Sequence, residues 1–259
     1  INLIHVNPSE LPLAFMDVGK NQWDTRYNIG YWLWELEEFP KEWLPAFHLL
    51  DEVWTPSEFI SQNLRKYTNK PVYTLPYSVT APADAAYDRD YFHLPKDRFL
   101  FLMMYDSGSG MVRKNPLGAI EAFKQAFDRE NKQVGLVIKM NRSEQSEKDI
   151  ENIRTKLDGY DNIYFICETL SKTAVNSLTA CVDVFVSLHR AEGFGLVMAE
   201  AMLLGTPVIA TNWSANTEFM NRESACMVDY KKTAIEQDIP PFKKGYHWAE
   251  ADVAQAAAY

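Results

Sequence analysis

Residues Arg190 to Leu204 read RAEGFGLVMAEAMLL, and this stretch decides the fold of the chain. It follows an apolar run, Asp183–Leu188, that predicts a β-strand, and it continues from Leu196 with a pattern that predicts an α-helix. A turn between a strand and a helix leaves N–H groups at the start of the helix without partners inside the helix. Such groups bind phosphate and other anions, so the turn is a candidate anion site.

The side chains of this turn suit a ligand that carries both phosphates and sugar hydroxyls. Gly193 and Gly195 lack a Cβ atom, so a ligand can approach the backbone closely there. Glu192 lies in the turn and Glu200 in the second turn of the helix, and carboxylates accept hydrogen bonds from hydroxyls. The alternative is a turn that serves the fold alone, because this order of strand, turn and helix also occurs where nothing binds.

Strand and helix patterns alternate along most of the chain, on both sides of an irregular, proline-containing stretch at residues 81–98. This alternation is typical of parallel sheets with crossover helices. We therefore expect an α/β protein with two Rossmann-like, doubly wound domains. The expected boundaries are a first domain over residues 1–80, a linker over 81–98 and a second domain over 99–259. Because the chain starts almost at once with a strand, we expect the first domain to be incomplete.

Several element boundaries are expected from single residues. Ser57, Asn115 and Ser171 precede amphipathic runs and are predicted to cap helices. Residues 8–26 are predicted to be irregular, a helix is predicted over Lys41–Leu50, and Cys226–Asp229 is predicted to be the last clear strand. The loops that leave the carboxyl ends of the second set of strands are expected to converge on one pocket, as ligand sites do in such sheets.

The composition of the chain indicates which classes of partner and which cellular compartment to expect. The formal net charge of -9 argues against a nucleic-acid partner. No apolar run reaches the length of a membrane span, and no signal peptide is visible. Cys167, Cys181 and Cys226 lie far apart, which indicates buried thiols in a reducing compartment. We therefore expect a cytoplasmic protein, with the inner face of the membrane as an alternative place of action.

The sequence Glu192-Gly-Phe-Gly-Leu, followed by Glu200-Ala-Met after seven residues between the glutamates, resembles the donor-site motif of retaining GT-B glycosyltransferases. It is most similar to glycosyltransferase family 4, the glycosyl transferases group 1. The resemblance is specific over Phe99–Asn221 and diffuse over Ile1–Tyr77. It implies transfer of a sugar from a UDP-, GDP- or ADP-sugar to a glycan or lipid-linked acceptor hydroxyl. It further implies a role in polysaccharide or other glycan biosynthesis, with peripheral membrane contact through the missing N-terminal part.

The resemblance implies catalysis without a metal or another cofactor, and the sequence contains no Asp-x-Asp pair or His/Cys ligand cluster. Basic side chains would then neutralise the leaving diphosphate. Arg113 and Lys114 match the basic position of the family, whereas Tyr105-Asp106-Ser107 stands where the family often has Gly-Arg. Arg113 is therefore a candidate substitute for the second phosphate-binding arginine. A solvated pair of cations on a loop is the alternative.

The same resemblance assigns the donor-binding residues. Glu192 would hold the sugar, Glu200 would hold the ribose hydroxyls, and backbone amides of the turn would hold the phosphates. The turn residues concerned are Gly193, Phe194, Gly195 and Leu196.

Four residues near strand ends have two interpretations each. Lys139 could approach the base or ribose, or it could be a surface lysine whose ammonium reaches solvent. His189 could donate to a ligand or be a packed core histidine. Ser214 and Asn216 resemble the polar loop that borders the sugar in the family, but Ser214 could equally cap a helix.

An acceptor site is a further hypothesis. Trp34 and Glu35 lie in an aromatic and acidic segment, and such residues bind sugar rings and hydroxyls. A buried aromatic core beneath an acidic surface loop accounts for the same residues.

Three other functions are open to a chain of this fold. One is a non-catalytic GT-B-like binding module, and retention of both Glu192 and Glu200 argues against it. Another is a GT-B enzyme of a different kind, such as a sugar-nucleotide epimerase or a phosphorylase, but no convincing pyridoxal lysine supports the latter. The last is a dinucleotide-dependent oxidoreductase, for which the required GxGxxG fingerprint is missing.

Overall fold

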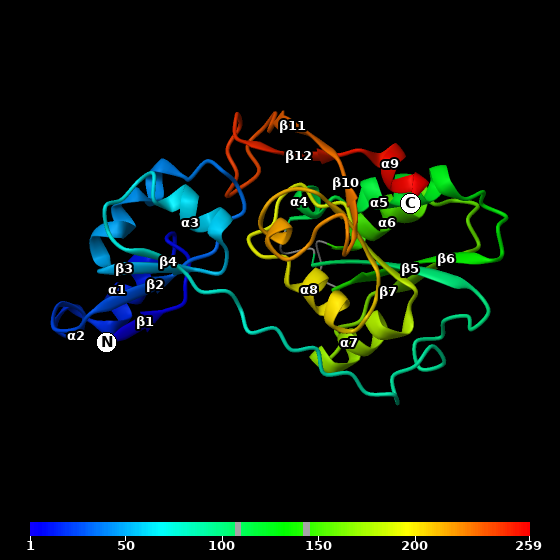
Figure 1. Ribbon diagram of the computed structural model, residues 1–259, viewed down its shortest axis with the longest axis horizontal. Coiled ribbons are helices and arrows are strands. Elements are labelled where there is room, and N and C mark those ends of the chain that lie inside the picture. Colours follow the sequence, from blue (N-terminus) through cyan, green and yellow to red (C-terminus); the bar gives the residue numbers. More distant parts are fainter. Residues whose placement is uncertain (107–109, 142–145) are drawn as a thin grey trace.

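The computed structural model, which describes residues 1–106, 110–141 and 146–259, contains two parallel β-sheets, each in a lobe of its own (Figure 1). The four-stranded sheet of the first lobe has the order β1-β2-β3-β4. Its strands are β1 (Asn2–Ile4), β2 (Asn28–Tyr31), β3 (Glu52–Thr55) and β4 (Val72–Thr74). The helices around it are α1 (Leu11–Val18), α2 (Lys20–Asp24), the 3-10 helix η1 (Lys41–Leu49) and α3 (Glu58–Leu64).

One local expectation in the first lobe is wrong and another is confirmed. The stretch expected to be irregular, residues 8–26, contains α1 and α2, because Leu11 and Trp23 are buried in the core of the lobe. The Trp23 indole also donates to the carbonyl of Leu49 at 2.7 Å. The helix expected over Lys41–Leu50 is present as the 3-10 helix η1 over Lys41–Leu49, and Pro45 inside it has no N–H to donate.

The six-stranded sheet of the second lobe has the order β10-β9-β8-β5-β6-β7, and all its strand pairs are parallel. The strand order reverses between β5 and β8, which is the topological switch point where open α/β sheets bind ligands. This arrangement confirms the expected α/β class. The strands are β5 (Phe99–Tyr105), β6 (Val134–Met140), β7 (Ile163–Ile166), β8 (Val184–Ser187), β9 (Val208–Thr211) and β10 (Cys226–Val228).

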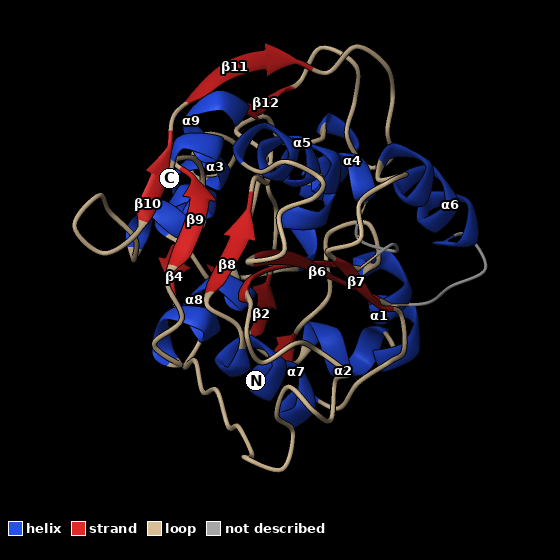
Figure 2. Cartoon of the chain, turned by 90° about the vertical axis from the view of Figure 1, so that its right-hand side faces the viewer, coloured by secondary structure: helices blue, strands red, loops and turns tan. Residues whose placement is uncertain are grey.

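Helices cover both faces of this sheet (Figure 2). One face carries α5 (Pro116–Ala126), α6 (Ser146–Lys156) and α9 (Val253–Ala258), and the other carries α7 (Lys172–Cys181) and α8 (Leu196–Leu203). The short helices α4 (Met111–Lys114) and η3 (Ala215–Glu218) follow strand ends. The three predicted caps are confirmed, because Ser57, Asn115 and Ser171 each accept a backbone N–H with their side chain.

An antiparallel hairpin follows β10, so the expectation that β10 is the last strand is wrong. It consists of β11 (Tyr230–Ala234) and β12 (His247–Ala251), and it lies across the top of both lobes in Figure 1. Ile235, Phe242 and Trp248 from this segment are buried in the core of the first lobe. The expected boundaries assign these residues to the second domain, whereas their apolar contacts lie in the first lobe.

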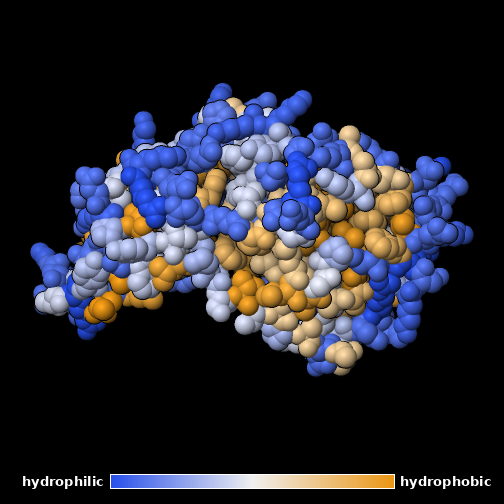
Figure 3. All heavy atoms as spheres, in the orientation of Figure 1, coloured by the Kyte–Doolittle hydropathy of each residue, from blue (hydrophilic) through white to orange (hydrophobic). Residues whose placement is uncertain are grey.

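The surface differs from region to region on the face drawn in Figure 3. Hydrophilic side chains cover the outer end of the second lobe, apolar side chains gather along the lower middle, and both kinds are mixed at the outer end of the first lobe (Figure 3). None of the helices in the described part of the chain is long and apolar enough to span a membrane. The three cysteines are partly buried rather than fully buried.

Candidate active site

The switch point brings together two loops from the carboxyl ends of β5 and β8. The first loop ends in α4, which carries Arg113 and Lys114. The second contains residues 190–195, called here the Glu192 turn. The backbone N–H of Arg190 donates to the carbonyl of Arg113 at 2.8 Å, and the Asn115 amide donates to the carbonyl of Leu188 at 2.9 Å. Local caps and these cross-loop bonds therefore hold both predicted cations beside Glu192.

Four charged side chains form what we call the charge cluster: Glu35, Arg113, Lys114 and Glu192. Lys114 forms a salt bridge with Glu192, and Arg113 Nη1 lies 3.4 Å from the Glu192 carboxylate. Arg113 Nη1 also donates to the carbonyl of Ala191 at 2.8 Å, and its Nη2 lies 3.8 Å from Oε1 of Glu35. The cluster thus joins the second lobe to the loop after β2 in the first lobe.

The two carboxyl groups of the cluster have opposite pKa shifts. Burial alone would raise the pKa of Glu192, but the Lys114 ammonium and the Arg113 guanidinium lower it to about 2. Burial raises the pKa of Glu35, and the nearby Glu192 charge adds to this, while Arg113 and Lys114 act in the opposite direction. Glu192 is therefore held as a carboxylate, and Glu35 is the more basic of the two groups.

The backbone of the Glu192 turn has the open amides expected of an anion site. Within the described residues, the N–H groups of Phe194, Gly195 and Leu196 donate to no acceptor. Gly195 has φ of 90°, which favours glycine, and it directly precedes α8. These amides lie beside two cations and at a helix N-terminus, an arrangement suited to a phosphate group.

Gly193 serves a different purpose from the one expected. A Cβ atom on Gly193 would lie 3.0 Å from the carbonyl oxygen of Trp34 in the first lobe. Ser57 Oγ also donates to the carbonyl of Gly193 at 2.8 Å. The missing side chain at Gly193 therefore allows the two lobes to pack, and the expectation of close ligand approach at this residue is not supported by the geometry.

A cavity of about 380 Å³ lies next to the cluster at the carboxyl ends of β5 and β6. It is lined by Lys114, Lys139 and Lys172, among others. Lys139 is buried and donates to the carbonyl of Met140 and to Asn141, and burial lowers its pKa. Its interpretation as a surface lysine is therefore wrong. The loop Met140–Ser143 was also expected to converge on this pocket; Asn141 lines it, and residues 142 and 143 lie outside the described residues.

Glu200 is buried on α8, and its Oε1 lies 2.5 Å from the ammonium of Lys172. Lys172 is half exposed and is the first residue of α7, directly after the Ser171 cap. Sequence reasoning missed Lys172, although its position at a capped helix start beyond a strand was an available signal. Lys172 is thus the third lysine that lines the cavity, and its ion pair connects Glu200 to this site.

His189, Ser214 and Asn216 lie beneath the Glu192 turn rather than facing open space. His189 is fully buried, with Nδ1 at 3.0 Å from Ser187 Oγ and Nε2 at 3.1 Å from Asn216 Oδ1. Burial lowers its pKa, so the neutral imidazole is favoured, and the interpretation as a packed core histidine holds. Ser214 Oγ accepts the Glu192 N–H at 2.9 Å and does not cap η3. These residues position the turn.

The first lobe contributes one of its two expected residues. Trp34 is buried against Trp43 and Phe242, and its indole donates to the carbonyl of Glu38 at 2.7 Å, so it belongs to the core. Its expected role as a stacking surface for a sugar is wrong. Glu35 instead reaches the charge cluster.

Further contacts hold the lobes together at the same cleft. Sequence reasoning missed Glu218 of η3, whose carboxylate accepts the N–H groups of Glu58 and Phe59 at 3.0 and 2.7 Å. The Phe194 ring packs between the rings of Tyr77 and Phe219. The Glu192 turn is therefore in contact with both lobes.

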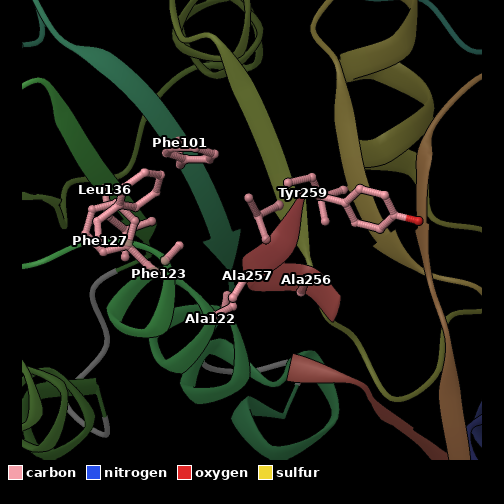
Figure 4. A pocket seen from close by; sticks show the side chains of 12 residues that line it. Phe101, Ala122, Phe123, Phe127, Leu136, Ala256, Ala257 and Tyr259 are labelled. Carbon is pink, nitrogen blue, oxygen red and sulfur yellow. The ribbon is translucent and has the colours of Figure 1, made fainter. Parts of the chain in front are cut away.

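Two other hollows have a mainly apolar lining. The cavity in Figure 4 has a volume of about 60 Å³ and lies between α5, α9 and the sheet, where Phe101, Phe123 and Tyr259 line it. A groove of about 530 Å³ beside the linker is lined mainly by apolar side chains such as Tyr77, Phe194 and Leu203. Over residues 1–106, 110–141 and 146–259, no group of three or more His, Cys, Asp or Glu side chains is arranged to hold a metal ion.

Solved structures share this fold at low sequence identity. Anabaena HepE in complex with UDP-glucose aligns with a TM-score of 0.66 at 18% identity, over 85% of this chain and 62% of that one. Sucrose-phosphate synthase from Thermosynechococcus elongatus aligns with a TM-score of 0.67 at 18% identity, over 88% of this chain and 60% of that one. The chain therefore spans about three fifths of the length of these two proteins.

A pneumococcal O-GlcNAc transferase, GtfA, in complex with UDP and GlcNAc has a TM-score of 0.64 at 13% identity, over 88% of this chain and 46% of that one. These likenesses establish the two-lobed GT-B architecture. A search of curated proteins returned no match. The family model for glycosyl transferases group 1 matches residues 93–243, which is more than half of the chain and includes Arg113, Lys114, Glu192 and Glu200. The chain belongs to the glycosyl transferases group 1 family.

Proposed function

We propose that this chain binds a nucleotide-activated sugar and transfers the sugar, with retention, to an acceptor hydroxyl, as an enzyme of glycosyltransferase family 4. The observation that carries this proposal is the placement of Arg113 and Lys114 beside the open amides of the Glu192 turn. Two cations and a helix N-terminus suit a diphosphate, and no bound metal is then needed to neutralise it. Binding of UDP-glucose by HepE, which has the same fold, supports a nucleotide-sugar as ligand.

Different side chains of the site would bind different parts of the donor. The diphosphate would lie against Arg113, Lys114 and the amides of residues 194–196. Glu200 would accept hydrogen bonds from the ribose hydroxyls, and Lys172 would exchange its contact with Glu200 for the ligand. Glu192 would accept a hydrogen bond from a hydroxyl of the sugar, and it would remain ionised because its pKa is about 2. The nucleoside would occupy the cavity lined by Lys139.

The charge that develops on the leaving diphosphate would be stabilised by groups that are already in place. Arg113 is held by the carbonyl of Ala191, and Lys114 is held by Glu192. Preorganised charges of this kind lower the barrier because they do not have to reorient during the reaction. Transfer to a glycan or lipid-linked acceptor would serve polysaccharide or other glycan biosynthesis.

A thermal-shift screen against UDP, GDP, ADP and their sugar conjugates tests this proposal. A ligand at 100 times its dissociation constant stabilises the fold by about 2.7 kcal/mol, which corresponds to a shift of several degrees. We expect one nucleotide to produce such a shift, and Glu200→Ala to reduce it. Glu121→Ala, which removes an exposed carboxylate of α5 that does not line the cavity of Lys139, is the matched control and should leave the shift intact.

Two further readouts separate the alternatives. Release of the nucleoside diphosphate from the sugar conjugate that binds, unchanged by EDTA, is expected of a metal-independent transferase. Nucleotide binding without any such release favours a binding module, and interconversion of the sugar without release favours an epimerase. If a folded sample shows no shift with any nucleotide, the donor site is wrongly assigned.

A further inference from the structure

Lys139 is the only charged or polar side chain of β6, a strand in which every residue is buried. Successive side chains of a strand point to opposite faces of the sheet. Ile138 and Met140 pack in the core cluster that contains residues of α5 and α9, whereas Val137 packs in the cluster that contains residues of α7 and α8. Lys139 shares a face with Val137, so it lies on the α7–α8 side of the sheet, near the carboxyl end of its strand.

The ammonium of Lys139 is a hydrogen-bond donor held in a fixed position. It donates to the carbonyl of Met140 at 3.2 Å and to Oδ1 of Asn141 at 3.0 Å. The Asn141 amide donates in turn to Oδ2 of Asp106 at 2.7 Å, which turns its oxygen toward Lys139. Burial lowers the pKa of Lys139, but the nearby Asp106 and Glu168 carboxylates oppose this in favour of the ammonium form. An ammonium has three N–H donors, so these two contacts leave one for a ligand.

The three lysines that line the cavity have partners of different kinds. Lys114 pairs with the carboxylate of Glu192, and Lys172 pairs with that of Glu200. Within the described residues, Lys139 forms no salt bridge, and both of its hydrogen-bond partners are neutral oxygens. Lys114 and Lys172 are therefore suited to charged or exchanging partners, whereas Lys139 is suited to one more neutral acceptor.

The cavity thus has two ends with different chemistry. The pair of Lys172 and Glu200, where the ribose is proposed to bind, forms one end. Lys139, Asn141 and Asp106 form the other, where β5 and β6 end. With the diphosphate at the Glu192 turn and the ribose at Glu200, the part of the donor left for Lys139 is the edge of the base remote from the ribose.

We propose that Lys139 donates a hydrogen bond to a carbonyl oxygen at this edge of the nucleobase, and that the site therefore selects uracil or guanine over cytosine or adenine. This proposal rests on the proposed transferase function. Uracil presents O4 at this edge and guanine presents O6, and both oxygens accept an N–H. Cytosine and adenine carry an amino group at the corresponding atom, so two donors would face each other.

Rejection of the amino bases follows from the burial of Lys139. A buried donor that loses its partner is costly, and a site built to donate a hydrogen bond discriminates strongly against a ligand that lacks the acceptor. The Asp106 carboxylate also lines the cavity and could accept from an amino group, but its Oδ2 is engaged by Asn141. The contacts at this end of the cavity therefore favour a carbonyl.

The test measures binding of two matched pairs of nucleotides to the wild type by calorimetry. UDP and CDP differ only at the C4 substituent and the adjoining ring proton, and GDP is compared with ADP. We expect the carbonyl-bearing member of the pair that binds to be favoured by about 10-fold or more, as for a hydrogen bond from a charged donor. The pair that binds more tightly distinguishes uracil from guanine.

Two variants of Lys139 connect this preference to its ammonium. Lys139→Met keeps an unbranched side chain without a donor, and the ratio of the two dissociation constants should fall close to 1. Lys139→Gln keeps an N–H donor and should retain part of the preference, and it decides the question if Lys139→Met does not fold. Both nucleotides are measured on one preparation, so a loss of folded protein cancels in the ratio.

Lys172→Met is the matched control, because it removes a lysine of the same cavity that contacts Glu200 instead. It should change the affinities for both members of a pair by the same factor and leave their ratio as in the wild type. A merely structural role of Lys139 would likewise change both affinities together, whereas recognition of the base changes the ratio.

The outcomes separate this inference from the proposed function. If nucleotides bind to the wild type without a preference for the carbonyl base, or with a preference for the amino base, the inference is overturned and the donor site stands. The same conclusion follows if folded Lys139→Met keeps the wild-type ratio, or if it binds no nucleotide at all. If the folded wild type binds none of the four nucleotides, the proposed function itself fails.

Discussion

The carboxyl edges of the two sheets present different chemistry to the same cleft. The edge of the second sheet carries ion pairs, Lys114 with Glu192 and Lys172 with Glu200. The edge of the first sheet carries the carboxyl group of Glu35, which faces the charge cluster, and aromatic rings, with Tyr31 and Tyr77 at 5.7 Å. At the edge of the second sheet, ion-paired side chains can exchange their partners for a charged ligand. At the edge of the first sheet, aromatic rings and the Glu35 carboxyl group suit a neutral molecule that carries hydroxyl groups.

The difference is sharpest between Glu35 and Glu192, which lie near the same arginine. Lys114 contacts Glu192 directly, and together with Arg113 it lowers the pKa of Glu192 to about 2 despite burial. Glu35 lies farther from its cation, with 3.8 Å between its Oε1 and Arg113 Nη2, so burial prevails and its pKa is raised. Two carboxyl groups in one cluster are thereby suited to different tasks, because the number and distance of nearby cations differ.

The largest effect on binding and stability is expected from Lys114→Met, which breaks the ion pair between Lys114 and Glu192 at the carboxyl edge of the second sheet. This change removes a proposed diphosphate ligand and leaves the buried Glu192 with one cation instead of two. We expect nucleotide binding to be lost and the free energy of unfolding to fall by about 3 kcal/mol, as for other broken buried pairs. Calorimetry and urea unfolding measure the two quantities.

The double variant Lys114→Met, Glu192→Gln is its control. Removing both charges should restore much of the stability, because no buried charge is left unpaired, but it should not restore nucleotide binding. Recovery of binding in the double variant would contradict the assignment of Lys114 as a diphosphate ligand.

A second prediction uses pH to compare the two carboxyl groups. The folded-state pKa of Glu192, about 2, lies below its ordinary value of 4.5, so the group stabilises the fold above pH 4.5 and loses this contribution as pH falls toward 2. The contribution amounts to about 3 kcal/mol by linkage. Urea unfolding of the wild type and Glu192→Gln should therefore show a stability difference that shrinks steadily over this range.

Glu35 should behave with the opposite sign. Its folded-state pKa is raised, so its contribution is present at low pH and is lost as pH rises through the folded-state value. Glu35→Gln should consequently become more stable relative to the wild type as the pH rises. If the stabilities of Glu35→Gln and Glu192→Gln, each relative to the wild type, depend on pH in the same way, the two carboxyl groups do not have opposite pKa shifts.

The smallest effect on stability and turnover is expected from a change where the two lobes pack against each other, at Gly193. In Gly193→Ala the new Cβ would lie 3.0 Å from the carbonyl oxygen of Trp34, so the lobes must move apart slightly. We expect the free energy of unfolding to fall by about 1–3 kcal/mol, the range for overpacking, and turnover to fall with it. Unfolding and donor turnover are measured on the same preparation.

Gly245→Ala is the control for this prediction. Gly245 has φ of 86° and open space where a Cβ would lie, so alanine there introduces backbone strain without contact between the lobes. The strain should lower stability by about 1 kcal/mol and leave turnover unchanged. If Gly193→Ala also leaves turnover unchanged, the contact between the Glu192 turn and the first lobe does not matter for the reaction.

Much of the second lobe was predictable from sequence because its signals are local. The strand before the Glu192 turn, the helix after it and the caps at Asn115 and Ser171 depend on residues within a few positions of one another. The first lobe was less predictable, since α1 and α2 are stabilised by burial of Leu11 and Trp23 against distant residues. The hairpin β11–β12 was missed because its apolar residues pack on the other lobe.

The sequence by itself determined the parallel α/β pattern, the strand–turn–helix unit proposed to bind an anion, and the places of Arg113, Lys114, Glu192 and Glu200 along the chain, because spacing along the chain encodes local structure. Only the tertiary structure decided which residues these side chains contact. It placed Glu35 beside Arg113, Lys172 on Glu200 and Gly193 against Trp34. It also buried His189 beneath the turn. Each of these contacts joins residues that are far apart in the chain or separated by a buried layer, and no local spacing encodes such a distance.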